Sequence, residues 1–281
     1  MTSSQAAPWG AQYRLIAAEK WKAKSAAMGN AVTEALVEYA RPADGMAVLD
    51  LASGTGEPAI SLARSVGPTG SVVAADQSAD LLEIAAERAR HKKLGNLITK
   101  QTDAHKLPFG DGTFDLATCR FGVMFFADVV GALTELRRVL KPGARACFAA
   151  WGPIEQPYWQ TTMKIVQRHV GGAILGAGGA NPFRFSVPGS LSDVLRAAGF
   201  QDVEESTRKL PWMWPATGAE DADEVFAYAC AVSVPFRPML DRVPEEMWAT
   251  IRAEAREAIE GYRVGNEIRF GAEIVMASGR A

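Results

Sequence analysis

The chain has few cysteines, and they lie far apart. Its 281 residues contain three, Cys119, Cys147 and Cys230, an odd number with no C-x-x-C spacing. A disulfide framework uses an even set of cysteines, and a structural zinc site uses closely spaced pairs. We therefore expect no disulfide framework and no metal site.

The sequence also lacks long apolar runs and an excess of charge of either sign. No run approaches the roughly 18 apolar residues of a membrane span, and residues 1–5 do not begin a secretory signal. We therefore expect a cytoplasmic protein with no membrane span. The 30 basic and 32 acidic residues give a net charge of −2, so no nucleic-acid partner is expected. The basic pair Arg137–Arg138 is expected to be a solvated helix face.

The most informative segment is VLDLASGTGEP at residues 48–58. It places Asp50 at the end of an apolar strand and two glycines, Gly54 and Gly56, in the turn that follows. Residues without a Cβ let the chain bend sharply and bring backbone N–H groups against a small molecule. The segment therefore predicts a ligand-binding turn between a strand and a helix.

Two ligands fit the spacing of this turn. Gly54-x-Gly56-x-x-Ala59 matches the loose dinucleotide pattern, with Asp76 near the position of its ribose-binding acid. However, Asp50 and Glu57 would place two carboxylates close to a pyrophosphate. A cationic ligand such as S-adenosylmethionine, which carries an ammonium and a sulfonium, suits these carboxylates better.

Five segments in order resemble the class I S-adenosylmethionine-dependent methyltransferases, in the UbiE/COQ5-like branch (methyltransferase type 11). They are VLDLASGTG (48–56), VVAADQS (72–78), QTDAHKLPF (101–109), FDLATCRFGVMFF (114–126) and LRRVLKPGARACFAAW (136–151). One position departs from the usual D-x-G-x-G-x-G, because Ala52 replaces the first glycine. Alanine keeps negative φ accessible, so a slightly tighter loop is expected there.

Alternating strand and helix patterns predict an α/β fold with a parallel, doubly wound sheet. The resemblance implies a Rossmann-like sheet of seven strands, mostly parallel with an antiparallel last strand at the edge, plus helical cap insertions. We expect a single methyltransferase domain over 1–281, with an N-terminal helical segment at 1–45, a cofactor-binding core at 46–152 and cap insertions at 153–187 and 218–264. The expected strands are 47–51, 70–75, 97–102, 114–118, 145–150, 202–209 and 267–278.

The resemblance also implies roles at the strand ends. Asp50 and the 52–56 turn would hold the methionine moiety, Asp76 the ribose hydroxyls, and Asp103 the edge of the adenine. Arg120 and Phe121 would flank the methionine and the reacting methyl. The full implied cofactor set is Asp50, Ala52, Ser53, Gly54, Gly56, Pro58, Asp76, Gln77, Asp103, Ala104, Arg120 and Phe121.

The sequence does not identify a catalytic base. Methyl transfer from a sulfonium is an in-line displacement, so positioning the acceptor can supply much of the catalysis. Of the three histidines, His169 is the one in the first insertion and is the catalytic candidate, with an ordinary surface position as the alternative.

Aromatic residues are concentrated after the fifth expected strand, although some of them must be plain core. They predict a pocket for a small aromatic or apolar acceptor, methylated at carbon, oxygen or nitrogen. A homodimer is left open. Two other functions also stay open, a cofactor-binding cyclase of the same fold and an NAD-dependent oxidoreductase. The proposed pocket residues are Trp151, Tyr158, Trp159, Phe183 and Phe185.

Overall fold

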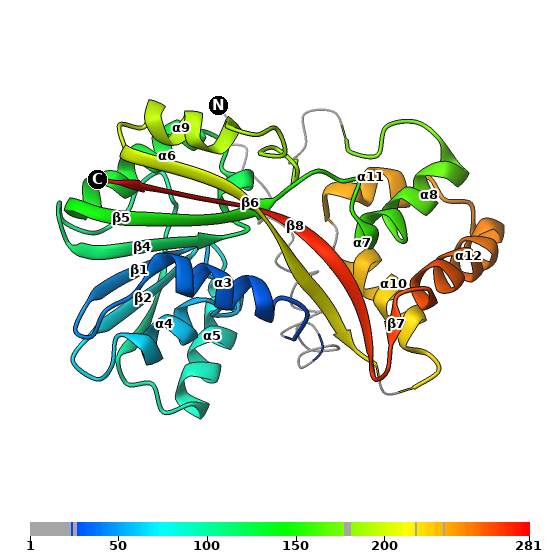
Figure 1. The fold of residues 1–281 in the computed structure, drawn as a ribbon, viewed down its shortest axis with the longest axis horizontal. Helices are drawn as coiled ribbons and strands as arrows, with labels where there is room; N and C mark the ends of the chain where they lie inside the picture. Colours follow the sequence, from blue (N-terminus) through cyan, green and yellow to red (C-terminus); the bar gives the residue numbers. More distant parts are fainter. Residues whose placement is uncertain (1–23, 25–26, 177–180, 217, 233) are drawn as a thin grey trace, which may run out of the picture. The chain divides into compact units, whose positions relative to one another are not determined.

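The computed structural model describes residues 24, 27–176, 181–216, 218–232 and 234–281 (Figure 1). Those parts of the expected 1–45 and 153–187 segments that fall on 1–23, 25–26 and 177–180 lie outside the described residues. The chain divides into two compact units. The sheet unit is Ala31–Pro153, Pro182–Lys209 and Glu273–Ala281, and the helical unit is Met1–Asn30, Ile154–Asn181 and Leu210–Ala272.

The strands form one sheet in the order β3-β2-β1-β4-β5-β8-β6, and the short β7 pairs with β8. Strands β1 to β5 pair in parallel. Strand β8 is antiparallel to β5, with Arg145 opposite Arg280 and Trp151 opposite Ile274. The strands are β1 Ala47–Leu51, β2 Ser71–Asp76, β3 Leu97–Gln101, β4 Phe114–Arg120, β5 Leu140–Trp151, β6 Gln201–Pro215, β7 Arg263–Val264 and β8 Glu267–Arg280.

The predicted antiparallel last strand is confirmed, but its expected place at the sheet edge is wrong. Strand β8 lies between β5 and β6, and β6 is the edge strand. The apolar run Ile274–Ala277 is buried on both faces of the sheet, as expected for an interior strand, whereas residues 201–209 of β6 are largely exposed. Burial of a strand on both faces therefore predicts an interior position in the sheet better than the order of the strands along the chain.

Helices cover both faces of the sheet unit, as a doubly wound fold requires. In Figure 1, α4 (Ala59–Ser65) and α5 (Ala79–His91) lie on one side of the sheet, and α6 (Val129–Val139) and α9 (Ser190–Ala197) lie on the other. The sheet unit also contains α3 (Asn30–Ala40), apart from its first residue, and the short η1 (Val123–Phe125).

Side-chain caps set where two of these helices begin. Ser78 accepts a hydrogen bond from Leu81 N–H at the start of α5, and Asp128 accepts one from Gly131 N–H at the start of α6. Helix α6 ends at Val139 and the chain enters β5 directly. Leu140 pairs with Phe114 and Arg145 pairs with Leu116, so β5 begins before the expected strand at 145–150 and has an irregular register over residues 141–144.

The helical unit contains most of the remaining helices. They are α7 Pro157–Gln160, α8 Met163–Val170, α10 Asp221–Val232, η2 Val234–Phe236, α11 Arg237–Leu240, η3 Glu245–Met247 and α12 Trp248–Glu260. Across the described part of the chain, no helix combines the length and apolar character needed to cross a bilayer.

Candidate functional site

Asp50 lies at the carboxyl end of β1 and is completely buried. Its Oδ2 accepts a hydrogen bond from Ala59 N–H (3.1 Å) at the start of α4, and its Oδ1 accepts one from the Thr118 hydroxyl (2.7 Å) on β4. Burial raises the pKa of Asp50 to about 7, although Thr118 and the charge of Arg120 act to lower it. Asp50 therefore joins three elements beneath the site, and its contact with the methionine moiety stays a prediction.

The turn after β1 presents open backbone where a ligand is expected. Gly54 has φ +53°, and a Cβ built there would meet nothing within 4 Å. Gly56 has φ +105° and a different reason to be glycine, because its Cβ would lie 3.1 Å from the Ala85 side chain of α5. One glycine thus leaves space beside the turn, and the other lets the turn pack on α5.

Ala52 contradicts the expectation of ordinary negative φ at the position of the missing glycine. Its φ is +57°, in the left-handed region that alanine rarely occupies. The fold therefore keeps the glycine-like backbone and strains the alanine to adopt it. This strain costs on the order of 1 kcal/mol.

Asp76, at the end of β2, is tied to the same turn. Its Oδ2 accepts from Gly54 N–H and its Oδ1 from Ser78 N–H, each at 2.9 Å. The second bond is the helix-entry turn that a purely structural role would produce, whereas the first joins the carboxylate to the glycine turn. Asp76 therefore stands beside the open face of Gly54, where its predicted ribose contact would be made.

Ser53 supplies a polar atom suited to a ligand in this turn. Its N–H donates to Ala75 O (3.0 Å), but its hydroxyl is buried and has no hydrogen-bond partner in the part of the chain that the structure describes. A buried hydroxyl without a partner is costly unless something else completes it. The turn thus offers the Ser53 hydroxyl, the open space at Gly54 and the carboxylate of Asp76. These donors and acceptors fit a neutral or cationic ligand.

Glu57 and Pro58 form the entry to α4. Pro58 is the residue at the N-terminal cap, and its carbonyl accepts from Leu62 N–H (2.9 Å). Glu57 accepts from the Ser61 hydroxyl (2.8 Å) and lies 3.6 Å from a guanidinium nitrogen of Arg88. Because Arg88 balances the charge of Glu57, this carboxylate does not disfavour a phosphate ligand. Of the two carboxylates that favoured a cationic ligand over a pyrophosphate, only Asp50 still does so.

Asp103 and Ala104 lie in the 102–113 loop between β3 and β4. Asp103 Oδ1 accepts from His105 N–H (2.9 Å) and is 2.6 Å from His105 Nδ1. Partial burial acts to raise the pKa of Asp103, but the hydrogen bonds from His105 and Gln77 lower it overall. The loop therefore presents an ionised carboxylate, as the predicted contact with an exocyclic amine requires.

Arg120 and Phe121 follow β4. Arg120 Nη1 donates to the Thr33 hydroxyl of α3 (2.6 Å). Phe121 has φ +58°, and its ring stacks on Trp151 at the end of β5, with centroids 4.8 Å apart and planes at 15°. The ends of β4 and β5 therefore carry an ordered aromatic pair.

The five predicted pocket rings are distributed over both units, and all are buried. Trp151, Phe183 and Phe185 belong to the sheet unit. Tyr158 and Trp159 belong to the helical unit, where Tyr158 packs on Trp212 and Phe270, and Trp159 stacks on Phe236. For Tyr158 and Trp159 this geometry is that of a core, and a pocket role stays a prediction.

His169, the catalytic candidate, is held within the helical unit. It lies on α8, and its Nε2 is 2.6 Å from a carboxylate oxygen of Glu254 on α12. The same carboxylate also pairs with Arg168. These contacts link α8 to α12, which is a structural role for His169, and its catalytic role stays a prediction.

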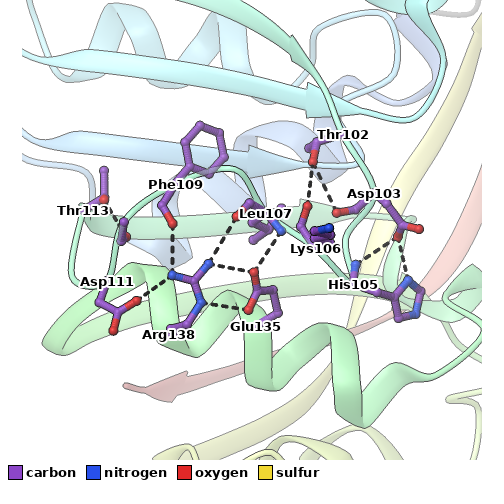
Figure 2. Close-up of polar contacts among 11 residues, drawn as sticks. Thr102, Asp103, His105, Lys106, Leu107, Phe109, Asp111, Thr113, Glu135 and Arg138 are labelled. Atoms are coloured by element: carbon purple, nitrogen blue, oxygen red, sulfur yellow. Dashed lines mark hydrogen bonds and ion pairs between the residues drawn. The ribbon is translucent and has the colours of Figure 1, made fainter.

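Several residues of this region were missed from the sequence. Thr118 and Arg88 carried no local signal, because only the fold brings them to Asp50 and Glu57. Arg138 is partly exposed, but the interpretation as a solvated helix face is incomplete, since its guanidinium also binds the 102–113 loop (Figure 2). Arg137, its neighbour, is exposed as expected.

The strand order, the antiparallel β8 and the glycine turn after β1 define the Rossmann-like fold of class I methyltransferases. The chain belongs to the ubiE/COQ5 methyltransferase family, whose model matches residues 19–173. It is an S-adenosylmethionine-dependent methyltransferase, so its cofactor is S-adenosylmethionine. That the 52–56 turn holds this cofactor stays a prediction.

A curated relative agrees with this assignment, and two solved structures share the fold. A demethylmenaquinone methyltransferase of Deinococcus radiodurans is 33% identical over 164 residues, covering 55% of this chain and 67% of that protein. The YcgJ protein from Bacillus subtilis matches 88% of this chain and 97% of its own, with a TM-score of 0.57 and 20% identity. The [4+2]-cyclase SpnF matches 88% and 80%, with a TM-score of 0.54 and 21% identity. The last two show the fold alone.

Proposed function

We propose that this enzyme methylates a small, planar, electron-rich aromatic acceptor of the phenol or hydroquinone class, at a ring carbon. The observation that carries the proposal is the stacked pair Phe121–Trp151 at the ends of β4 and β5. Stacked rings bury a large planar surface and favour a flat apolar ligand. The names of two relatives support a related acceptor, since one is a demethylmenaquinone methyltransferase and the other a C-methyltransferase of ubiquinone/menaquinone biosynthesis.

The chemistry asks little of the protein beyond positioning. Bound S-adenosylmethionine supplies a methyl group on a sulfonium, and an electron-rich ring carbon is itself a nucleophile. The 52–56 turn, with Asp76 and the Ser53 hydroxyl, would hold the cofactor, while Phe121 and Trp151 would orient the ring and exclude water. No residue is assigned as the base that takes the ring proton lost after transfer.

The acceptor is the part of this proposal that family membership supports least. The family model ends at residue 173, so the Leu210–Ala272 part of the helical unit lies outside it. Residues that choose an acceptor can therefore differ from those of the relatives. Oxygen and nitrogen acceptors are compared directly in the test.

The test is a methyl-donor assay against hydroquinones, phenols, indoles, small amines, tRNA and protein, reading S-adenosylhomocysteine and the mass of the product. Hydroquinones and phenols should give the highest kcat/KM, with the new methyl on carbon. Turnover confined to amines, tRNA or protein would reject the aromatic acceptor and leave the cofactor assignment intact. A changed acceptor without S-adenosylhomocysteine would instead favour the cyclase alternative.

A further inference from the structure

Arg138, in the last turn of α6, holds the 102–113 loop with three hydrogen bonds from its guanidinium group (Figure 2). Its Nη1 donates to Phe109 O (3.0 Å) and to Asp111 Oδ1 (2.6 Å), and its Nη2 donates to Leu107 O (3.1 Å). The remaining two N–H groups donate to the carboxylate of Glu135, at 2.8 and 2.7 Å. All five donors of an arginine are therefore in use.

Glu135 completes this clamp from the same helix. While it accepts from Arg138, its Oε1 also accepts from Leu107 N–H (2.9 Å). The hydrogen bonds from Arg138 hold the pKa of Glu135 below its ordinary value, so the pair stays ionised at neutral pH. Leu107 thus has both its backbone N–H and its carbonyl bound by side chains of α6.

The other end of α6 holds the loop as well. Asp128 N–H, at the N-terminal cap, donates to His105 Nε2 (3.3 Å). Because Nε2 accepts this bond, the ring proton is assigned to Nδ1, which faces Asp103 Oδ1 at 2.6 Å. His105 therefore joins Asp103 to the start of α6, and the Arg138–Glu135 pair joins Leu107 to its end.

The loop held in this way carries Asp103 and Ala104, the residues predicted to read the adenine. Helix α6 also follows the segment that carries Arg120 and Phe121, predicted to flank the methionine and the methyl. Helix α6 therefore holds one of the predicted cofactor segments through side-chain contacts and directly follows the other in the chain. We propose that Arg138, with Glu135, is a positioning residue that sets the adenine contact by clamping the 102–113 loop to α6.

The inference rests on the cofactor assignment and on the predicted role of Asp103. The test measures binding of S-adenosylhomocysteine by calorimetry to the full chain and to Arg138→Met, with Arg137→Met as the matched control. Arg138→Met should bind about tenfold more weakly, the scale of coupling within one hydrogen-bond network. Arg137→Met should bind within about twofold of wild type, because Arg137 is exposed.

A second ligand separates positioning from general destabilisation. S-inosylhomocysteine has an oxygen in place of the exocyclic amine, so wild type should prefer S-adenosylhomocysteine. In Arg138→Met this preference should shrink, and hydrogen exchange at residues 103–111 should accelerate. If Arg138→Met does not fold, Arg138→Lys and Glu135→Gln serve instead, since lysine cannot reproduce the planar fork.

The outcomes separate the two hypotheses. Wild-type protein that binds neither ligand would reject the cofactor assignment on which the inference rests. Wild-type binding with unchanged affinity in a folded Arg138→Met variant would reject the clamp alone. An equal loss for both ligands would also reject it, because a misplaced Asp103 must affect the amine-bearing ligand more.

Discussion

Ala52 occupies the space that a side chain at Gly122 would need, because a Cβ built on Gly122 would overlap the Cβ of Ala52. The glycine turn after β1 and the segment after β4 therefore meet through the methyl group of Ala52. Ala52 brings this methyl at the cost of a φ of +57°, whereas Gly122 has a φ of −102° that alanine can adopt. The two positions together have room for one methyl.

Gly122→Ala should therefore destabilise the protein by about 1–3 kcal/mol, the usual cost of overpacking. Adding Ala52→Gly should recover much of this loss, because it removes the clash and relieves the strained alanine. Recovery should be incomplete, since the same Cβ would lie 2.9 Å from Cys119 Sγ. Chemical denaturation measures the free energy of unfolding of the two single variants and of the double variant. If the two changes have additive effects on this free energy, the two positions do not share one space.

Asp50 should make the stability of the fold depend on pH. Its folded-state pKa of about 7 lies above its ordinary value of 3.8 because the carboxyl is buried. Between these values the folded state binds more protons than the unfolded state, so the contribution to stability is greatest below pH 3.8 and is lost as pH rises toward 7. Asp50→Asn removes this titration and can still accept from Ala59 N–H.

The measurement is urea denaturation of wild type and Asp50→Asn from about pH 4.5 to about pH 7.5, a range that spans most of this titration. The free energy of unfolding of wild type relative to the variant should fall with rising pH, by up to about 1.4 kcal/mol per pH unit. Parallel pH profiles for the two proteins would show that Asp50 stays ionised throughout this range.

Asp76 should contribute directly to cofactor affinity. Asp76→Ala is expected to weaken binding of S-adenosylhomocysteine by about 1.5–3 kcal/mol, the scale of a hydrogen bond to a charged group. Asp80→Ala is the matched control, because Asp80 is an exposed carboxylate in the first turn of α5. Calorimetric titration compares the two variants. Unchanged affinity in a folded Asp76→Ala variant would mean that Asp76 has only a structural role, through its hydrogen bonds to Gly54 and Ser78.

His169 is expected to stabilise the helical unit without taking part in methyl transfer. Replacing it with Asn removes the contact with Glu254 and should cost about 0.5–1 kcal/mol of stability, the range for a half-exposed polar pair. Turnover at saturating substrate should stay within about twofold of wild type. If folded His169→Asn instead turns over about 100-fold more slowly, the scale of a lost general base, His169 is restored as the catalytic candidate.

The sequence predicts the sheet unit well because its signals are local. The buried run at 47–51, the glycine turn and the cap at Ser78 each depend on a few neighbouring residues. The contacts that complete the site depend on the fold. Thr118 meets Asp50 across a strand pair, and Arg138 meets Leu107 between a helix and a loop, so neither contact leaves a pattern along the chain.

In the helical unit, the sequence does not predict the role of the aromatic residues. Tyr158 and Trp159 were expected to line an acceptor pocket, but aromatic composition alone cannot distinguish a pocket from a core. The structure gives both rings aromatic neighbours within the unit, as a core requires. Trp151 differs from them, because its partner Phe121 lies at a strand end that is expected to face the cofactor.

This difference leads to a prediction about the acceptor. Trp151→Phe should lower kcat/KM for planar acceptors by about tenfold, because a smaller ring covers less of a stacked ligand, and should leave the affinity for S-adenosylhomocysteine within about twofold. Trp214→Phe is the control, since Trp214 is a fully buried indole of the helical unit. It should lower stability and change neither kcat/KM nor the affinity for S-adenosylhomocysteine of the folded enzyme.

Steady-state kinetics with a saturating methyl donor compare the Trp151→Phe and Trp214→Phe variants. Equal losses of kcat/KM in both variants would mean that Trp151 acts only as core, and that the acceptor is recognised by other residues.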